Sequence, residues 1–204
     1  MSANKFLETV LDHSIPYHIA QNVFAPGHQF SIVKHIRKNL AALPTGEKIL
    51  DVGCGPASWL WRADLKPTGL DHSENYATSW KQRSQEYVVG SADALPFANH
   101  SFDGIWSIFL FHHLTDEQVR HALSEMERVC KPGGYISIFD GIYPDRWWQN
   151  PVAHAIRRAD RGQFMRLERD LEALFPNQSA WTFERWTYCL TGLEMISATR
   201  ILAS

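Results

Sequence analysis

The chain has 204 residues, of which 45% are hydrophobic and 21% charged, and its formal net charge is −2 at pH 7. This length fits one domain with a sizeable core, and the composition is ordinary for a globular protein. The slight negative charge argues against a nucleic-acid partner, because such proteins generally present a basic surface.

Cysteine usage and the start of the chain indicate a compartment. The three cysteines, at positions 54, 130 and 189, are widely spaced and form no CxxC pair, which is typical of reduced thiols in the cytoplasm. The first residues lack a long apolar run, so we expect neither secretion nor a membrane partner. The sequence leaves the oligomeric state open.

Residues 1–45 predict a helical cap that precedes the sheet. A first, aromatic-rich helix over 15–24 is broken by Ala25-Pro26-Gly27, and a second helix ends near residues 43–46. The apolar stripe of the second helix consists of Phe30, Ile32, Val33 and Ile36. In the first helix, a lid face or a simple packing face would be formed by Tyr17, His18, Gln21 and Phe24.

A buried strand that stops in a glycine turn, residues 48–57, is the most informative part of the chain. Its strand portion is apolar and β-branched apart from Asp51, which predicts a parallel strand covered on both faces. Gly53 and Gly55 permit unusual dihedrals and let a ligand approach the backbone. A helix over 58–63 follows directly and offers unpaired N–H groups. In open α/β sheets this crevice binds nucleotide-like ligands.

Asp71 ends a second short strand, residues 68–71, and lies 20 residues after Asp51. A carboxylate at this place can accept hydrogen bonds from both ribose hydroxyls of NAD or of S-adenosylmethionine. The dinucleotide fingerprint expects a further glycine where this chain has Ser58, which favours S-adenosylmethionine. His72 either flanks the adenine or is simply exposed.

A third strand, residues 86–89, runs into the loop 90–97. In this loop Asp93 can accept a hydrogen bond from an exocyclic adenine amine, while Ala94 and Leu95 flank the ring. Turn capping is the alternative role of such an aspartate.

The fourth strand, residues 105–110, offers two candidates to line the methionine arm of the cofactor, Ser107 and Phe109. It ends at Phe111-His112-His113-Leu114. A helix follows, for which Thr115 with Gln118 predicts a capping box. The segment 131–134 ends this helix and leads into a fifth strand. The buried stripe predicted for the helix is Val119, Ala122, Leu123, Met126 and Val129.

These motifs, in this order between Lys48 and Asp140, resemble those of class I S-adenosylmethionine-dependent methyltransferases. Within this class the motifs are most similar to those of the small-molecule enzymes that include the ubiquinone/menaquinone-biosynthesis C-methyltransferases. One departure is Ala57, which stands where many members carry a glycine. The resemblance implies a three-layer α/β/α Rossmann-like fold with a seven-stranded, mostly parallel sheet and an antiparallel last strand. It also implies S-adenosylmethionine as cofactor. The cofactor residues are then expected to be Asp51, Gly53, Gly55, Asp71, His72, Asp93, Ala94, Ser107 and Phe109.

The resemblance divides a single domain, residues 1–204, into four parts. These are the helical cap 1–45, the cofactor-binding core 46–140, a helical substrate or lid insertion 141–180 and a C-terminal β-hairpin 181–204. The insertion is predicted to be helical over 151–159 and 162–175. Its Trp147 and Trp148 could stack on an aromatic substrate or pack in the core. Its arginines, which could hold an acidic substrate or form a solvated helix face, are Arg157, Arg158, Arg161, Arg166 and Arg169.

His112 and His113 are the candidates for a general base, because histidine titrates near neutral pH. We interpret them first as structural or cofactor-side residues. We expect no metal site, because the side chains of adjacent residues tend to point in different directions and the sequence offers no further ligands at a suitable spacing. The function implied is methyl transfer to the O, N or C atom of an unidentified small molecule by in-line displacement. The alternatives are a catalytically silent S-adenosylmethionine-binding partner or sensor protein, and an NAD-dependent oxidoreductase.

Overall fold

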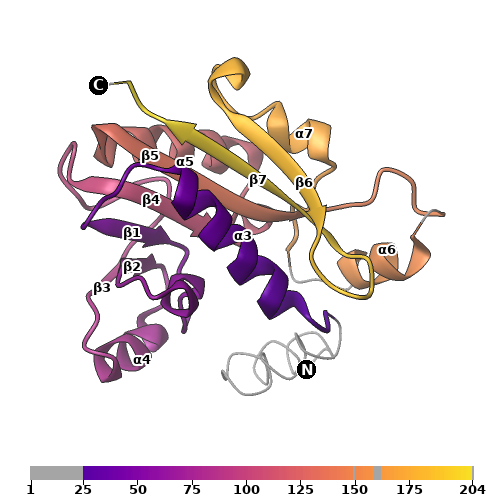
Figure 1. The fold of residues 1–204 in the computed structure, drawn as a ribbon, viewed down its shortest axis with the longest axis horizontal. Coiled ribbons are helices and arrows are strands. Elements are labelled where there is room, and N and C mark those ends of the chain that lie inside the picture. Colours follow the sequence, from indigo (N-terminus) through magenta and orange to yellow (C-terminus); the bar gives the residue numbers. More distant parts are fainter. Residues whose placement is uncertain (1–24, 149, 159–161, 204) are drawn as a thin grey trace.

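The computed structural model describes residues 25–148, 150–158 and 162–203 (Figure 1). The helix expected over 15–24, with its candidate lid residues Tyr17, His18, Gln21 and Phe24, lies outside the described residues. None of the helices in the described ranges is long and apolar enough to cross a membrane.

Seven strands form one sheet in the order β3-β2-β1-β4-β5-β7-β6. The first five strands pair in parallel, whereas β7 runs antiparallel to both of its neighbours, β5 and β6. This confirms the predicted fold class and the antiparallel last strand. The strands are β1 (Ile49–Val52), β2 (Thr68–Asp71), β3 (Tyr87–Val89), β4 (Phe102–Ile108), β5 (Cys130–Ile142), β6 (Thr182–Thr187) and β7 (Glu194–Ile201).

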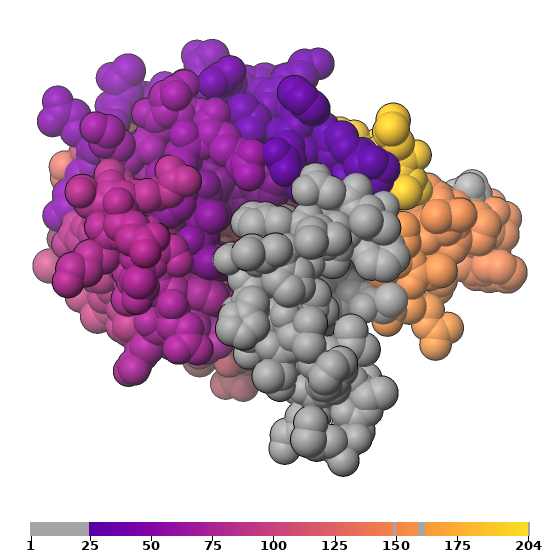
Figure 2. All heavy atoms as spheres, turned by 90° about the horizontal axis from the view of Figure 1, so that it is seen from below, coloured from indigo at the N-terminus to yellow at the C-terminus, as the bar shows by residue number. Residues whose placement is uncertain are grey.

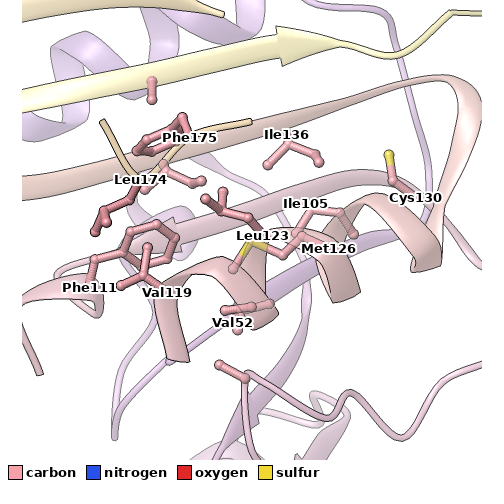
Figure 3. Packing of buried hydrophobic residues seen from close by; sticks show 14 of the residues in the cluster. Val52, Ile105, Phe111, Val119, Leu123, Met126, Cys130, Ile136, Leu174 and Phe175 are labelled. Carbon is pink, nitrogen blue, oxygen red and sulfur yellow. The ribbon is translucent and has the colours of Figure 1, made fainter. Parts of the chain in front are cut away.

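Helices cover both faces of this sheet and enclose two apolar clusters. One cluster packs α5 and α7 against β4 and β5 (Figure 3), and the other packs α3 and η1 against the opposite face. The helical elements are α3 (His28–Ala42), η1 (Trp59–Ala63), η2 (Glu74–Tyr76), α4 (Ala77–Gln82), η3 (Phe111–His113), α5 (Asp116–Val129), α6 (Pro151–Arg158), α7 (Glu168–Glu172) and η4 (Gln178–Ala180).

Helix α5 agrees with its prediction in both its start and its buried face. The Gln118 N–H donates to Thr115 Oγ1 at 3.3 Å, and the Thr115 N–H donates to Gln118 Oε1 at 3.0 Å, so the capping box is formed. The residues of its predicted stripe are all buried. Leu123 and Met126 lie against Ile105 and Ile136 in Figure 3.

The helix predicted over 58–63 is present as the 3₁₀ helix η1, Trp59–Ala63. Two other local predictions were wrong. In α3, Ile32 and Ile36 are buried but Phe30 is 86% exposed, because residues two positions apart on a helix point to nearly opposite faces. Within 162–175 only α7 is an α-helix, since the preceding backbone bonds to other segments, as in the Tyr143 N–H to Arg166 O bond of 2.9 Å.

The cofactor-side elements α4 and β3 lie at the opposite end of the molecule from helix α6 of the insertion (Figure 1). Figure 2 shows the region of α4 and β3 in magenta at one end and α6 in orange at the other. The sheet connects the two regions, and β4 and β5 lie between them.

Candidate cofactor and acceptor site

The turn after β1 depends on two glycines with different surroundings. Gly53 and Gly55 have φ values of +73° and +61°, which favour glycine. A Cβ on Gly53 would lie 2.8 Å from Leu110 Cδ1, whereas a Cβ on Gly55 would meet no heavy atom within 4 Å. The first glycine thus permits packing, and the second leaves open space against the backbone.

Asp71 faces this turn from the end of β2. Its Oδ2 accepts the Gly55 N–H at 3.0 Å, and its Oδ1 accepts the Ser73 N–H at 3.2 Å. The exposed His72 places Nδ1 3.1 Å from the same Oδ1. A carboxylate has about four acceptor positions, so these contacts orient the group and leave capacity for ligand hydroxyls.

Asp51, on β1, is the second carboxyl group at the turn. It is buried, and Ser58 Oγ donates to its Oδ2 at 2.5 Å. Burial raises the pKa of Asp51 to about 7; the Ser58 bond opposes this shift and the nearby Asp71 adds to it. Ser58 Oγ also accepts the Leu60 N–H at 3.1 Å and so caps η1. This acidic turn suits a cationic ligand group better than a diphosphate.

The loop after β3 carries Asp93 and Ala94. The Ser91 hydroxyl donates to Asp93 Oδ1, and the Ala94 N–H donates to Ser91 O at 3.2 Å. Asp93 is half-buried and Ala94 is exposed, so both are within reach of a ligand that lies over β2 and β3.

Sequence reasoning missed two residues that hold this loop in place. Glu125 accepts the Leu95 N–H at 2.8 Å, and Arg128 donates to Leu95 O at 2.9 Å and to Phe97 O at 2.8 Å. The two side chains also form an ion pair of 2.7 Å. Glu125 and Arg128 are three residues apart on the polar face of the predicted helix, and this spacing could have indicated that they act together.

The end of β4 carries the two other predicted cofactor residues. Ser107 is fully buried, and within the described ranges its hydroxyl has no hydrogen-bond partner. Phe109 has a φ of +64°, which is a genuine outlier for a bulky residue and is typical of functional sites. Its ring centroid lies 6.2 Å from that of Trp59 and 5.9 Å from that of Tyr188.

The two candidate histidines differ in environment. His112 is buried, and its Nδ1 lies 2.6 Å from Oδ1 of Asp140 near the end of β5. His113 is exposed, with its ring centroid 4.1 Å from that of His112. Asp140 was missed as a site residue, although a lone acid at the end of an apolar strand is a recognisable signal.

The arginines of the insertion do not form one anion site in the described ranges. Arg157 is buried and donates to Glu194 O at 2.8 Å. Arg166 donates to Phe111 O at 2.9 Å and to Leu114 O at 2.7 Å. Arg158 and Arg169 are exposed, and Arg161 lies outside the described residues. The solvated-face interpretation is therefore wrong for Arg157 and Arg166.

Two further expectations concern the tryptophans and metals. Trp147 and Trp148 are each 60% exposed, and their ring centroids lie 6.2 Å apart. In the part of the chain that the structure describes, no group of three or more His, Cys, Asp or Glu residues is arranged to hold a metal ion.

Comparison with known proteins places this site in a family. Residues 50–138 match the methyltransferase domain family. The chain is 37% identical over 122 residues to a demethylmenaquinone methyltransferase of Staphylococcus haemolyticus, covering 54% of this chain and 50% of that protein. Residues 50–138 are therefore those of a class I S-adenosylmethionine-dependent methyltransferase domain.

Other relatives differ in their acceptors. A tRNA (carboxymethyluridine(34)-5-O)-methyltransferase of Xenopus tropicalis is 37% identical over 120 residues, which are 55% of this chain and 19% of that protein. The chain thus spans half or less of the length of these two relatives. Among solved structures, a possible histamine N-methyltransferase of Thermotoga maritima superposes with a TM-score of 0.68 at 15% identity, covering 94% of this chain and 99% of the other, which shows a shared fold.

Proposed function

We propose that the protein transfers a methyl group from S-adenosylmethionine to a small-molecule acceptor. The observation that carries this proposal is the arrangement of Asp71 beside Gly55, with a 3.0 Å backbone contact and open space where a side chain would otherwise lie. Such a carboxylate at the end of β2 is suited to ribose hydroxyls.

Each end of the cofactor has matching residues in this turn. Asp71 would hold the ribose, and Asp93 with Ala94 would contact the adenine. The ionised form of Asp51 would attract the methionine ammonium, and Ser107 offers a buried hydroxyl to the same arm. When bound, the cofactor supplies a methyl group on a positively charged sulfur. The protein then has to align the acceptor and exclude water, a role that we assign to the flanking segments 1–45 and 141–180.

The chemistry of the turn favours this cofactor over NAD. Ser58 occupies the position of a fingerprint glycine, and its hydroxyl is used by the buried Asp51. A diphosphate at this turn would face the carboxyl groups of Asp51 and Asp71, and like charges repel strongly where water is excluded. The methionine ammonium would meet the same groups with the opposite sign.

The small-molecule acceptor is supported by the net charge of −2 and by the demethylmenaquinone methyltransferase relative. The tRNA methyltransferase relatives define the other outcome to be tested. Because the family match is confined to residues 50–138, the acceptor has to be identified by turnover rather than by similarity.

Calorimetric titration with S-adenosylmethionine, S-adenosylhomocysteine and NAD tests cofactor choice. We expect Asp71→Asn to weaken S-adenosylmethionine binding at least tenfold, because two ribose hydrogen bonds are worth about 1 kcal/mol or more each. Asp64→Asn is the matched control, since Asp64 is 88% exposed and its left-handed backbone suits asparagine. Unchanged affinity in Asp71→Asn would refute the ribose role.

Release of S-adenosylhomocysteine with a panel of acceptors separates an enzyme from a silent binding protein. The panel contains phenols, carboxylic acids, primary amines and tRNA that carries carboxymethyluridine at position 34, the acceptor named for the tRNA methyltransferase relatives. Methylation of a small acceptor supports the proposal, and methylation of tRNA alone would overturn the acceptor class. Binding without turnover on any of them would favour the sensor or partner function.

A further inference from the structure

His112 and Asp140 meet at the edge of the sheet where two neighbouring strands end. β4 and β5 are parallel, so their carboxyl ends lie side by side; η3 directly follows β4, and Asp140 lies near the end of β5. The two side chains are 6% and 2% exposed, and Nδ1 lies 2.6 Å from Oδ1. A contact this short between an imidazole and a carboxyl group is a strong, charge-assisted hydrogen bond.

The contacts of Asp140 fix which ring nitrogen of His112 carries the proton. Asp140 Oδ1 also accepts the Gly141 N–H at 2.8 Å. An oxygen that receives a backbone donor acts as an acceptor, so His112 Nδ1 is the donor in its bond to Asp140. In the neutral imidazole Nε2 then holds the lone pair, which is the tautomer that a general base requires.

The pair is connected to the cofactor turn by aromatic contacts. The Phe109 ring centroid is 6.3 Å from that of His112 and 6.2 Å from that of Trp59. Trp59 directly follows Ser58, the partner of Asp51. The rings of Phe109 and Trp59 therefore link the imidazole to the turn.

The insertion packs closely on the same imidazole. A Cβ on Gly162 would lie 2.2 Å from His112 Cδ2, so only glycine fits there. The Phe164 N–H donates to His112 O at 3.0 Å, and Arg166 donates to the carbonyl of Phe111, which begins η3, and to that of Leu114, which follows η3. The ring is thus held on one side by β5 and on another by the segment that we assign to the acceptor.

We propose that His112 is the general base of the methyl transfer, positioned by Asp140, and that the acceptor carries an acidic O–H or C–H group of the phenol or enol type. This inference rests on the function proposed above and names the acceptor class.

In the proposed step His112 Nε2 takes the acceptor proton. The electron pair left on the acceptor oxygen or carbon forms the new bond to the methyl carbon. The electron pair of the broken carbon–sulfur bond returns to sulfur, which becomes a neutral thioether. The imidazolium, stabilised by Asp140, later releases its proton to water.

The charged and titratable groups near His112 in the described part of the chain are Asp140 on β5, His113 on η3 and Arg166 in the insertion. We expect turnover on an acceptor that keeps its proton to rise with pH, because the imidazole has to be unprotonated to take that proton.

Two aromatic acceptors that differ in acidity separate a base from a structural residue. Phenol keeps its proton at pH 8, whereas 4-nitrophenol is largely ionised and needs no base. In His112→Asn the amide N–H can retain the bond to Asp140 while Nε2 is lost. We expect kcat to fall about 10²- to 10³-fold on phenol, but no more than about threefold on 4-nitrophenol. The matched control is His121→Asn, on the exposed surface of α5, with unchanged rates on both.

Further measurements make every outcome decisive. Asp140→Asn should lower kcat on phenol about tenfold and remove the imidazole limb of the pH profile, with the dissociation constant of S-adenosylmethionine within twofold of the parent value. Equal losses on both acceptors in His112→Asn would show a structural role and overturn the base, while the methyltransferase proposal would stand. Turnover of amines alone would likewise overturn the proposed acceptor class and base, while the methyltransferase proposal would stand.

If none of these acceptors is methylated, ¹⁵N NMR of the S-adenosylhomocysteine complex decides. The His112 signals should show a protonated Nδ1 and an unprotonated Nε2 at pH 8. A proton fixed on Nε2 would overturn the proposal. Absence of cofactor binding in the parent protein would instead refute the proposed function itself.

Discussion

The turn around Gly53 and Gly55 and the insertion around Arg166 are positioned by contacts of very different range. Asp71 lies 16 residues from Gly55, and Asp51 lies 7 residues from Ser58. Arg166, in contrast, lies 55 residues from Phe111. The cofactor side of the molecule is thus encoded in short motifs, whereas the acceptor side exists only when distant segments pack together.

Arg166→Met tests this difference with the largest expected effect. The side chain of Arg166 is 9% exposed, and its guanidinium binds the carbonyls of Phe111, Leu114 and Phe164. Losing several hydrogen bonds from a charged group, one of them to the buried Phe111, should lower the free energy of unfolding by about 3 kcal/mol. Urea denaturation measures this. The affinity for S-adenosylmethionine should stay within about twofold, because no contact to the glycine turn is removed.

Arg169→Met is the matched control, since Arg169 is 81% exposed and surface changes cost about 0.5 kcal/mol or less. Equal stability of the two variants would show that the contacts of Arg166 are dispensable. A large loss of cofactor affinity in Arg166→Met would show that the two regions are coupled and that their separation is wrong.

The two glycines of the turn sharpen the comparison within the cofactor side. Alanine at either position strains a left-handed backbone by about 1 kcal/mol. At Gly53 the added Cβ also meets Leu110 at 2.8 Å, so we expect about 2–3 kcal/mol of destabilisation in total. Gly55→Ala should cost only the backbone strain yet weaken S-adenosylmethionine binding at least tenfold, because its Cβ occupies the open space.

Thermal unfolding and calorimetry on both variants measure the two effects. We expect Gly53→Ala to lose more stability than Gly55→Ala. Relative to its smaller loss of stability, Gly55→Ala should show the larger loss of affinity for S-adenosylmethionine. Unchanged affinity in Gly55→Ala would mean that the ligand does not approach this part of the backbone.

The fold was predictable from the sequence because its signals are local. The β-branched run before Gly53, the capping box of Thr115 and the apolar stripe of α5 each lie within a few residues. The seven-stranded sheet with its antiparallel last strand followed from the family resemblance rather than from any single motif. The roles of the predicted cofactor residues stay predictions.

The acceptor side could not be predicted for the opposite reason. Arg157 looked solvated because nothing in its local sequence shows that it would be buried, where it donates to the Glu194 carbonyl and its guanidinium lies over the ring of Tyr188. The segment around Arg166 has a helical pattern, but its backbone and side chain bond to β5 and η3 instead. Likewise, His112 could be distinguished from His113 only by the position of Asp140. Tertiary partners overrode local preference in each case.

The protonation of Asp51 gives the smallest effect and the most specific one. Burial raises the pKa of Asp51 to about 7, and a cationic ligand group would stabilise the ionised form. Binding should therefore release a proton, and affinity should fall as pH drops through 7. Between pH 8 and pH 6 the dissociation constant of S-adenosylmethionine should rise about tenfold. Calorimetry in buffers of different ionisation enthalpy measures both the constant and the proton release.

Asp51→Asn supplies the control and a second sign test. The variant should bind more weakly at pH 8 and should lose the Asp51 contribution to the pH dependence. The raised pKa also means that the folded parent binds a proton more tightly than the unfolded chain, so its stability falls as pH rises from about 4 to about 7. Without that ionisation, Asp51→Asn should unfold at a higher temperature than the parent protein at pH 8. A lower unfolding temperature together with unchanged affinity would show that the ionised Asp51 stabilises the turn and does not serve the ligand.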